Sequence, residues 1–195
     1  MADILWARHG ENVANLTRTL SYRVFDGDLT DTGRRQATEL AERLASARLT
    51  GLFCSPLRRA RQTAEVLGRR LRLRITAELD DLRELNVGAL DGRNDPEAWD
   101  IYRRVLEAWR AGQPEVAFPE GENLDQLVTR LRRALAGVAG YGGRALVVAH
   151  GASLRAALPG LTGVPDPGHD LPTGGFATLR FDPEAVHLLD WPRRS

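Results

Sequence analysis

Three short apolar segments of this chain each end in side chains that could bind a phosphate group and attack it. The groups that follow these segments are Arg8 with His9, Ser55 with Arg58 and Arg59, and His150 with Gly151. A guanidinium group matches the oxygens of a phosphate in a bidentate manner, and a neutral imidazole nitrogen can attack phosphorus as a nucleophile. Two histidines beside arginines therefore predict phosphoryl transfer.

For this chemistry the three segments must be neighbouring strands of one sheet. Residues 4–7, 51–54 and 144–149 are apolar runs of strand length, and apolar residues at helical spacing predict helices between them. Parallel strands of an open α/β sheet end at one edge, where such folds bind ligands. Residues 176–181 and 186–191 alternate and predict a final antiparallel pair. The expected fold class is α/β, a three-layer α/β/α sandwich with a mostly parallel mixed sheet and helices on both faces.

The chain is predicted to form a single domain over residues 1–195. A helical cap-like insertion is expected around residues 93–120. A third strand is expected at residues 73–76, followed by a long loop over 78–95. The residues before Leu29 are expected to form a polar loop, and the helix after Gly151 is expected to end before Pro159.

The composition excludes several classes of protein. All 27 basic residues are arginine, and with 26 acidic residues the net charge is +1. A P-loop NTPase needs a lysine on the phosphates, and a Schiff-base enzyme needs a lysine amine, so the absence of lysine excludes both classes. The near-zero net charge argues against nucleic-acid binding. The histidines lack the spacing of metal ligands, so no metal and no cofactor are expected. One cysteine, Cys54, cannot form an internal disulfide.

Six sequence blocks, in order, resemble the signatures of the histidine phosphatase superfamily, which includes the phosphoglycerate mutases. The R-H-G block is present with a following Glu-Asn, and the L-T-x-x-G-x-x-Q-A helix start is also present. The blocks cover residues 5–15, 29–37, 55–64, 82–92, 121–130 and 147–151. R-H-G alone would be a weak match, but six blocks in the right order make the resemblance strong. It implies an α/β fold and transfer through a phosphohistidine.

The resemblance implies a role for each matching residue of the catalytic set. His9 would be the nucleophile that becomes phosphohistidine, and Arg8 would hold the phosphoryl oxygens. His150 would donate a hydrogen bond to the transferring group. Glu84 matches the family's proton donor, which is needed because an alkoxide is a poor leaving group unless it is protonated as the P–O bond breaks.

Four further residues are expected to bind the substrate. The resemblance implies that Asn15 and the amide of Gly151 contact the phosphate. Ser21 and Tyr22 stand where other members of the family place a threonine, serine or glutamine beside glycine, so this loop departs from the pattern. Which residue of the loop at 16–28 contacts phosphate is therefore open, with Ser21 and Tyr22 as the candidates.

The second arginine of the family pattern could be Arg58 or Arg59. The apolar stripe that starts at Leu57, together with the family's S-x-L-x-x-A spacing, favours Arg58. Arg59 is then expected to be a solvated helix residue.

Three enzymatic interpretations remain after these assignments. A phosphatase acting on a small phosphorylated substrate is favoured over a mutase, because the stretch after Glu84 lacks the mutases' arginine and tyrosine and lysine is absent. A serine hydrolase using Ser153 is the less favoured alternative, since Arg155 replaces the final glycine of the nucleophile elbow. We expect a cytoplasmic protein with no membrane or nucleic-acid partner, for which a homodimer stays open.

Overall fold

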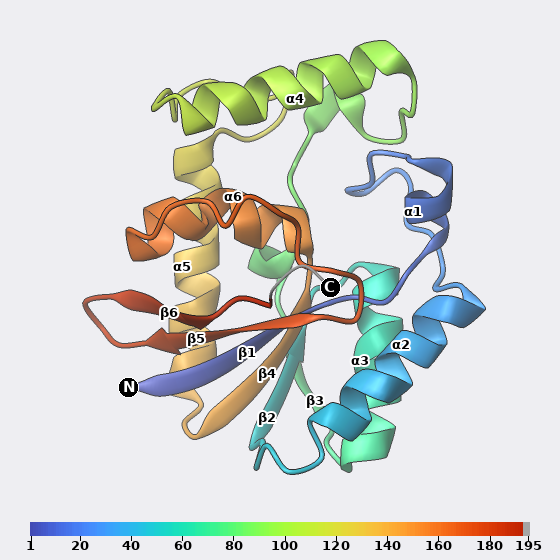
Figure 1. The fold of residues 1–195 in the computed structure, drawn as a ribbon, viewed down its shortest axis with the longest axis vertical. Coiled ribbons are helices and arrows are strands. Elements are labelled where there is room, and N and C mark those ends of the chain that lie inside the picture. The colour runs from blue at the N-terminus through green and yellow to red at the C-terminus, as the bar shows by residue number, and fades with distance from the viewer. Residues whose placement is uncertain (193–195) are drawn as a thin grey trace.

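The computed structural model describes residues 1–192 of the chain, and its centre is one mixed sheet of six strands (Figure 1). The strand order is β3-β2-β4-β1-β5-β6. The strands are β1 (Ala2–Arg8), β2 (Gly51–Cys54), β3 (Ile75–Glu78), β4 (Arg144–Ala149), β5 (Phe176–Phe181) and β6 (Val186–Asp190). Four strands are parallel, and β5 and β6 are antiparallel to their neighbours, which confirms the predicted mixed sheet.

The register of the parallel strands brings their carboxyl ends to one edge of the sheet. Arg8 of β1 lies opposite Ala149 of β4, and Cys54 of β2 lies opposite Val148 of β4. The residue that follows each strand is therefore held beside the residues that follow its neighbours. This edge is the place where open α/β sheets bind ligands.

Alternate side chains of the central strands pack into two cores on opposite faces of the sheet. Leu5 and Ala7 belong to the core under α2 (Asp31–Arg43) and α3 (Arg58–Leu71). Ile4 and Trp6 belong to the larger core, which includes α5 (Leu124–Gly140) and α6 (Gly151–Thr162). Each fully buried apolar side chain of this kind contributes about 1.5–3 kcal/mol to stability. The three-layer arrangement follows from this alternation and agrees with the expectation.

One long helix lies over the edge at which the parallel strands end. In Figure 1, α4 (Pro96–Arg110) crosses the top of the molecule above α6. Asp95 caps its first turn by accepting a hydrogen bond from the amide of Ala98, and Pro96 starts it. This helix lies within residues 93–120, and their role as a cap-like insertion stays a prediction. Organisation as a single domain over residues 1–195 stays a prediction, and residues 193–195 lie outside the described part.

The structure differs from the predicted elements in four places. Helix α1 (Val13–Thr17) lies inside the expected polar loop, because Asn12 and Asn15 form a reciprocal capping box. Strand β3 begins at Ile75 rather than at residue 73. Short 3₁₀ turns, η1 (Asp80–Leu82) and η2 (Gly88–Leu90), occupy the expected loop, and α6 continues through Pro159 to Thr162.

None of the helices within residues 1–192 is long and apolar enough to cross a membrane.

Candidate active site

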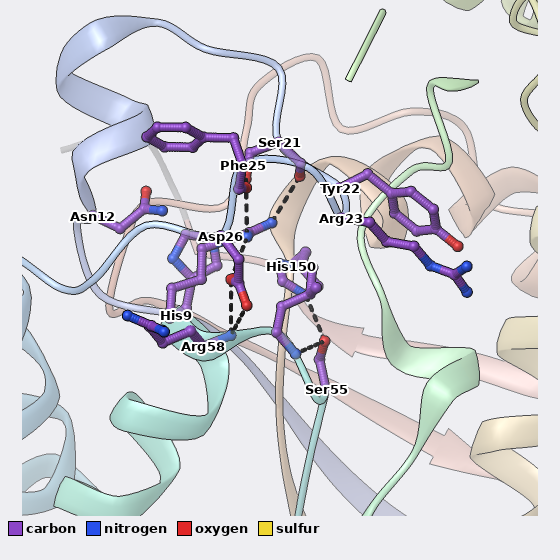
Figure 2. A network of polar contacts seen from close by, with 12 residues as sticks. His9, Asn12, Ser21, Tyr22, Arg23, Phe25, Asp26, Ser55, Arg58 and His150 are labelled. Atoms are coloured by element: carbon purple, nitrogen blue, oxygen red, sulfur yellow. Dashed lines mark hydrogen bonds and ion pairs between the residues drawn. The ribbon is translucent and has the colours of Figure 1, made fainter. Parts of the chain in front are cut away.

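The predicted convergence of the two histidines is present at the carboxyl edge of the sheet. The amide of His9 donates to the carbonyl of Ala149 at 3.0 Å, so the residue after β1 lies beside the end of β4. The ring centroids of His9 and His150 are 5.3 Å apart and meet edge to face. Figure 2 shows both rings with Ser55, which follows β2. Three segments far apart in the sequence therefore build one site.

The hydrogen bonds of His9 determine which of its ring nitrogens can act as a nucleophile. Nδ1 lies 2.7 Å from the carbonyl oxygen of Gly10, an acceptor, so Nδ1 holds the proton. On the other side of the ring, Nε of Arg59 donates to Nε2 at 3.2 Å, which requires a lone pair on Nε2. Burial, together with the charges of Arg59 and Arg8, lowers the pKa of His9 well below its usual 6.5. His9 is thus neutral near pH 7, with its Nε2 lone pair in the site.

The second arginine of the site is Arg59, and the expectation for Arg58 was wrong in geometry. Arg59 is 2% exposed, and besides His9 it donates to the hydroxyl of Ser21 at 3.1 Å and to the Ser21 carbonyl at 3.0 Å. Its guanidinium also pairs with Asp26 at 3.6 Å. These contacts orient the guanidinium against the nucleophile.

Arg58 points to solvent at the start of the same helix. Its side chain is 54% exposed and lies 3.4 Å from Asp28, while its amide donates to Asp26. The cause is the conformation of Leu57, which is the extended N-cap of α3 and not a helical residue. Counting the helical stripe from Leu57 therefore selected the wrong arginine.

His150 is held by one hydrogen bond to its backbone and one to its ring, and its second ring nitrogen has no partner. Its carbonyl accepts from Nε1 of Trp6 at 3.0 Å, and its Nε2 lies 2.8 Å from the Ser55 hydroxyl. That hydroxyl accepts from the amide of Leu57, and no other acceptor for its proton is present among residues 1–192, so it donates to His150. Nδ1 is then the protonated nitrogen, and it is buried without a partner. His150 does not itself line the cavity, so contact of its Nδ1–H with a bound group stays a prediction.

Arg8 lines the cavity beside His9, and Gly151 supports it from behind. Nη1 of Arg8 donates to the carbonyl of Leu171 at 2.7 Å, while its Nε is buried without a partner. A Cβ at Gly151 would lie 2.8 Å from Cδ of Arg8, so a larger residue at that position would displace the guanidinium. Gly151 does not itself line the cavity, and contact of its amide with phosphate stays a prediction.

The loop residues expected to bind the substrate divide into two groups. Asn15 and Ser21 line the cavity. The amide of Tyr22 donates to Asp91 at 2.8 Å and its ring lies under Arg23, so the side chain turns away from His9, as Figure 2 shows. Tyr22 does not line the cavity, and the expectation that it contacts the substrate was wrong in geometry. Asp91 fixes this loop by accepting from three successive amides, which point Ser21 inward and Tyr22 outward.

Glu84 lines the cavity and is fixed by the start of α6. Its Oε1 accepts from the amide of Ser153 at 2.7 Å and from that of Leu85 at 3.0 Å. Its carbonyl accepts from Arg130, which also donates to the carbonyls of Asp81 and Arg83. The backbone around Glu84 is therefore held by one guanidinium.

Arg130 is in turn held by Glu122, a pair whose contribution the sequence reasoning missed. The two side chains are 2.7 Å apart, with exposures of 15% and 7%. Both residues lie in the block at 121–130, and their spacing of eight residues was the available signal. A buried charged pair with good geometry is needed here because it satisfies three carbonyls of a loop.

The neutral state of the two site histidines predicts a pH-dependent stability. Burial lowers the pKa of His150, like that of His9, well below 6.5, whereas in the unfolded chain both titrate near 6.5. Below pH 6.5 the unfolded state binds more protons, so the free energy of unfolding falls as the pH falls, until the folded-state pKa values are reached. We expect a slope of up to about 2.7 kcal/mol per pH unit between pH 6.5 and 5.

Urea denaturation at a series of pH values measures this slope. The variant His9→Gln/His150→Gln should lose most of it, whereas His187→Gln, at an exposed histidine, should keep it. Equal slopes in the wild type and the double variant would show that the two buried rings are not the cause.

Three buried donors around His9 have no partner and thus form a receptor for an anion. They are Nε of Arg8, Nδ2 of Asn12 and Nδ1 of His150. A buried unpaired donor costs about 1–3 kcal/mol, so a folded protein rarely keeps three together unless a ligand satisfies them. No cluster of three metal-ligating side chains occurs within the described residues, and the arginines would repel a cation. The cavity thus brings unpaired donors of Arg8 and Asn12 and the ring of His9 to one place, where an anion could bind.

Comparison with known proteins agrees with this geometry. A probable phosphoglycerate mutase GpmB of Photorhabdus laumondii is 34% identical over 173 residues, which span 85% of this chain and 77% of that protein. A metal-independent phosphoserine phosphatase of Arabidopsis thaliana is 32% identical over 160 residues, spanning 80% and 67% of the two chains.

A solved structure gives the same result for the fold. The mycobacterial glucosyl-3-phosphoglycerate phosphatase in complex with VO3 superposes with a TM-score of 0.81 at 25% identity, covering 97% of this chain and 98% of that one. The model of the histidine phosphatase superfamily (branch 1) matches residues 4–193. With paired histidines at the sheet edge, arginines around them and this match along nearly the whole sequence, the chain belongs to the histidine phosphatase superfamily.

Proposed function

We propose that this protein is a metal-independent phosphomonoesterase that hydrolyses a small phosphorylated substrate through a phosphohistidine on His9. The observation that carries the proposal is the neutral His9, with the Nε2 lone pair next to the three unpaired donors. Such a site binds the phosphate and presents a nucleophile to it. Arg8 and Arg59 supply the positive charge that a metal supplies in other phosphatases.

The proposed reaction has two steps, phosphorylation of His9 and then its dephosphorylation. Nε2 of His9 attacks phosphorus, the bond from phosphorus to the alcohol oxygen breaks, and Glu84 in its acid form protonates that oxygen. Water then attacks the phosphohistidine, Glu84 takes its proton, and inorganic phosphate leaves with His9 restored. Arg8, Arg59 and the Nδ1–H of His150 hold the phosphoryl oxygens in both steps.

Two other activities compete with this proposal. Phosphoglycerate mutase activity is suggested by the name of the bacterial relatives. It would need a second anion site, and the other arginines that line the cavity, Arg110 and Arg155, are already paired with Asp166 and Asp170. A serine hydrolase would need an exposed nucleophile, whereas the Ser153 hydroxyl is buried, does not line the cavity and has no basic partner within residues 1–192. The geometry thus contradicts the Ser153 alternative.

Hydrolysis of p-nitrophenyl phosphate in the presence and absence of EDTA tests the proposal. We expect equal rates in both, because no step needs a metal, and strong inhibition by vanadate, whose trigonal bipyramid imitates the phosphoryl group in transfer. If dialysis against EDTA removed activity and a divalent metal restored it, the metal-independent mechanism would be wrong.

Replacement of Glu84 by glutamine should affect substrates according to their leaving groups. Glutamine cannot supply a proton, so kcat/KM for alkyl phosphates, which reports the step that expels the alcohol, should fall by about 10²- to 10⁴-fold. For phenyl phosphates kcat/KM should fall much less, because a phenolate leaves with little protonation. The measurement is kcat/KM for both classes, with Glu39→Gln on the exposed face of α2 as the control. Equal losses for both classes would argue against the acid role.

A further inference from the structure

The cavity continues well beyond the phosphate-binding end and changes character there. It has a volume of about 730 Å³, which is the size of sites that bind drug-sized ligands and far more than one phosphate needs. Its wall opposite His9 comes from α4 and α6. The apolar residues on this wall include Trp99, Tyr102, Leu106, Trp109, Ala152 and Ala156.

The aromatic residues on this wall form a rigid, preformed surface. The ring of Tyr102 stacks on Phe118 at 5.6 Å and meets the edge of Trp99 at 5.2 Å. Trp109 meets Phe118 at 5.4 Å. The indole N–H groups are already satisfied, because Trp99 donates to the carbonyl of Arg18 and Trp109 to that of Val116. What remains toward the cavity is mainly apolar ring surface, which favours an apolar ligand.

The charged groups on the far rim neutralise one another. Arg155 lies 2.7 Å from Asp166 and 2.8 Å from Asp170, and Arg110 lies 3.0 Å from Asp166. These two arginines are balanced by two carboxylates, and the pairing with Arg155 and Arg110 helps to lower the pKa of Asp166 to about 2, so the balance holds at neutral pH. Among the cavity-lining residues, the other cations are Arg8 and Arg59 at the phosphate end. Among the residues that line the cavity away from the phosphate end, no unpaired cation is left to bind a second anion.

From these two observations we infer that the preferred substrate is the phosphate monoester of an uncharged alcohol or phenol with a bulky apolar or aromatic body. The inference rests on the proposed phosphatase function and adds the chemistry of the leaving group. The phosphate occupies the end formed by Arg8, His9 and Arg59, and the apolar body lies against the rings of α4. A carboxylate on the leaving group would lose its hydration at this rim without gaining a cation, because both arginines there are already paired with carboxylates.

Two primary alkyl phosphates that differ only at the far end test the inference. 3-Phenylpropyl phosphate and 4-phosphonooxybutanoate share the same three-methylene chain and have leaving groups of similar basicity, but one ends in phenyl and the other in carboxylate. We expect kcat/KM to be about 10- to 100-fold higher for the phenyl ester, the ratio given by burying one aromatic ring. An equal or higher value for the carboxylate ester would overturn the inference.

Two variants then test which residues produce the preference. Trp99→Ala should lower kcat/KM for the phenyl ester by about tenfold and change that for the carboxylate ester little, with Leu189→Ala, at an exposed position of β6, as the control. Asp166→Asn should leave Arg110 without its carboxylate, while Arg155 keeps Asp170, and should raise kcat/KM for the carboxylate ester. If kcat/KM in Trp99→Ala fell equally for both esters, the assignment of this wall to the apolar body of the substrate would be wrong.

Failure of the proposed function has a different signature. In that case neither ester nor p-nitrophenyl phosphate is hydrolysed by the wild type. Calorimetric titration with the two esters then still decides the inference, because tighter binding of the phenyl ester would support the apolar wall and tighter binding of the carboxylate ester would refute it.

Discussion

Replacing His9 by alanine should lower kcat for p-nitrophenyl phosphate by at least about 10⁴-fold and remove the phosphoenzyme altogether. Alanine has no lone pair to attack phosphorus, and water is a far weaker nucleophile in its place. Arg8 and Arg59 stay in position, so the variant should still bind inorganic phosphate. The expected signature is therefore lost turnover with retained binding of the anion.

Quenching the enzyme and ³²P-labelled substrate in alkaline denaturant traps the intermediate, and treating aliquots with acid or base then tests its stability. Phosphohistidine is labile in acid and stable in base, which distinguishes it from a phosphoserine on Ser153. His187→Ala serves as the control, because this histidine is exposed, pairs with Asp182 and belongs to the β5–β6 hairpin. An acid-labile phosphoenzyme in His9→Ala would refute the assignment of the nucleophile.

The parts of the site that follow from the sheet could be predicted from the sequence. Buried parallel strands are recognisable as apolar runs, and polar residues directly after them, such as His9 and His150, must meet at one edge. Two residues that are 141 positions apart can thus be placed together from the amino-acid sequence alone. Their orientation cannot be predicted in this way, because it depends on single hydrogen bonds from each ring to Gly10 and Ser55.

Loops were predicted less well, because their geometry depends on contacts that no local pattern records. Tyr22 turns outward because the distant Asp91 accepts from the amides of residues 22–24. The short helix α1 depends on a capping box made of two asparagines rather than the usual serine or threonine with glutamate. Asp91 becomes a neighbour of this loop only with the fold, whereas the capping box of α1 is local and differs from the usual pattern only in its residue types.

The choice between Arg58 and Arg59 could have been made from helix geometry alone. Successive residues of an α-helix are about 100° apart, and Ala60, Ala64 and Leu67 define the buried stripe of α3. Arg59 then lies about 100° from the centre of that stripe, next to Thr63, while Arg58 lies about 160° away, toward solvent. The error came from placing the arginine directly after Leu57, which is the extended N-cap of the helix, at φ −65° and ψ 135°.

The two arginines therefore offer a matched pair of substitutions at adjacent positions. Arg59→Ala should lower kcat/KM by about 10²- to 10³-fold, because it removes a buried donor aimed at the phosphoryl oxygens and at Nε2 of His9. Arg58→Ala should change kcat/KM by less than about threefold, since an exposed pair such as that with Asp28 contributes little. Arg59→Lys keeps the charge but loses the planar fork, so it should restore only a small part of the activity.

The pH profile separates a role in the site from a role in folding alone. Burial is the main cause of the low pKa of His9, and the charge of Arg59 lowers that pKa further. In Arg59→Ala the pKa of His9 should rise, so the acid limb of kcat/KM should move to higher pH, whereas a merely unstable variant would keep the limb in place and lose amplitude. The same profile for Arg58→Ala should match the wild type. If Arg58→Ala moved the limb and Arg59→Ala did not, the exposed arginine would be the one that acts on the nucleophile, and the orientation of α3 described above would be wrong.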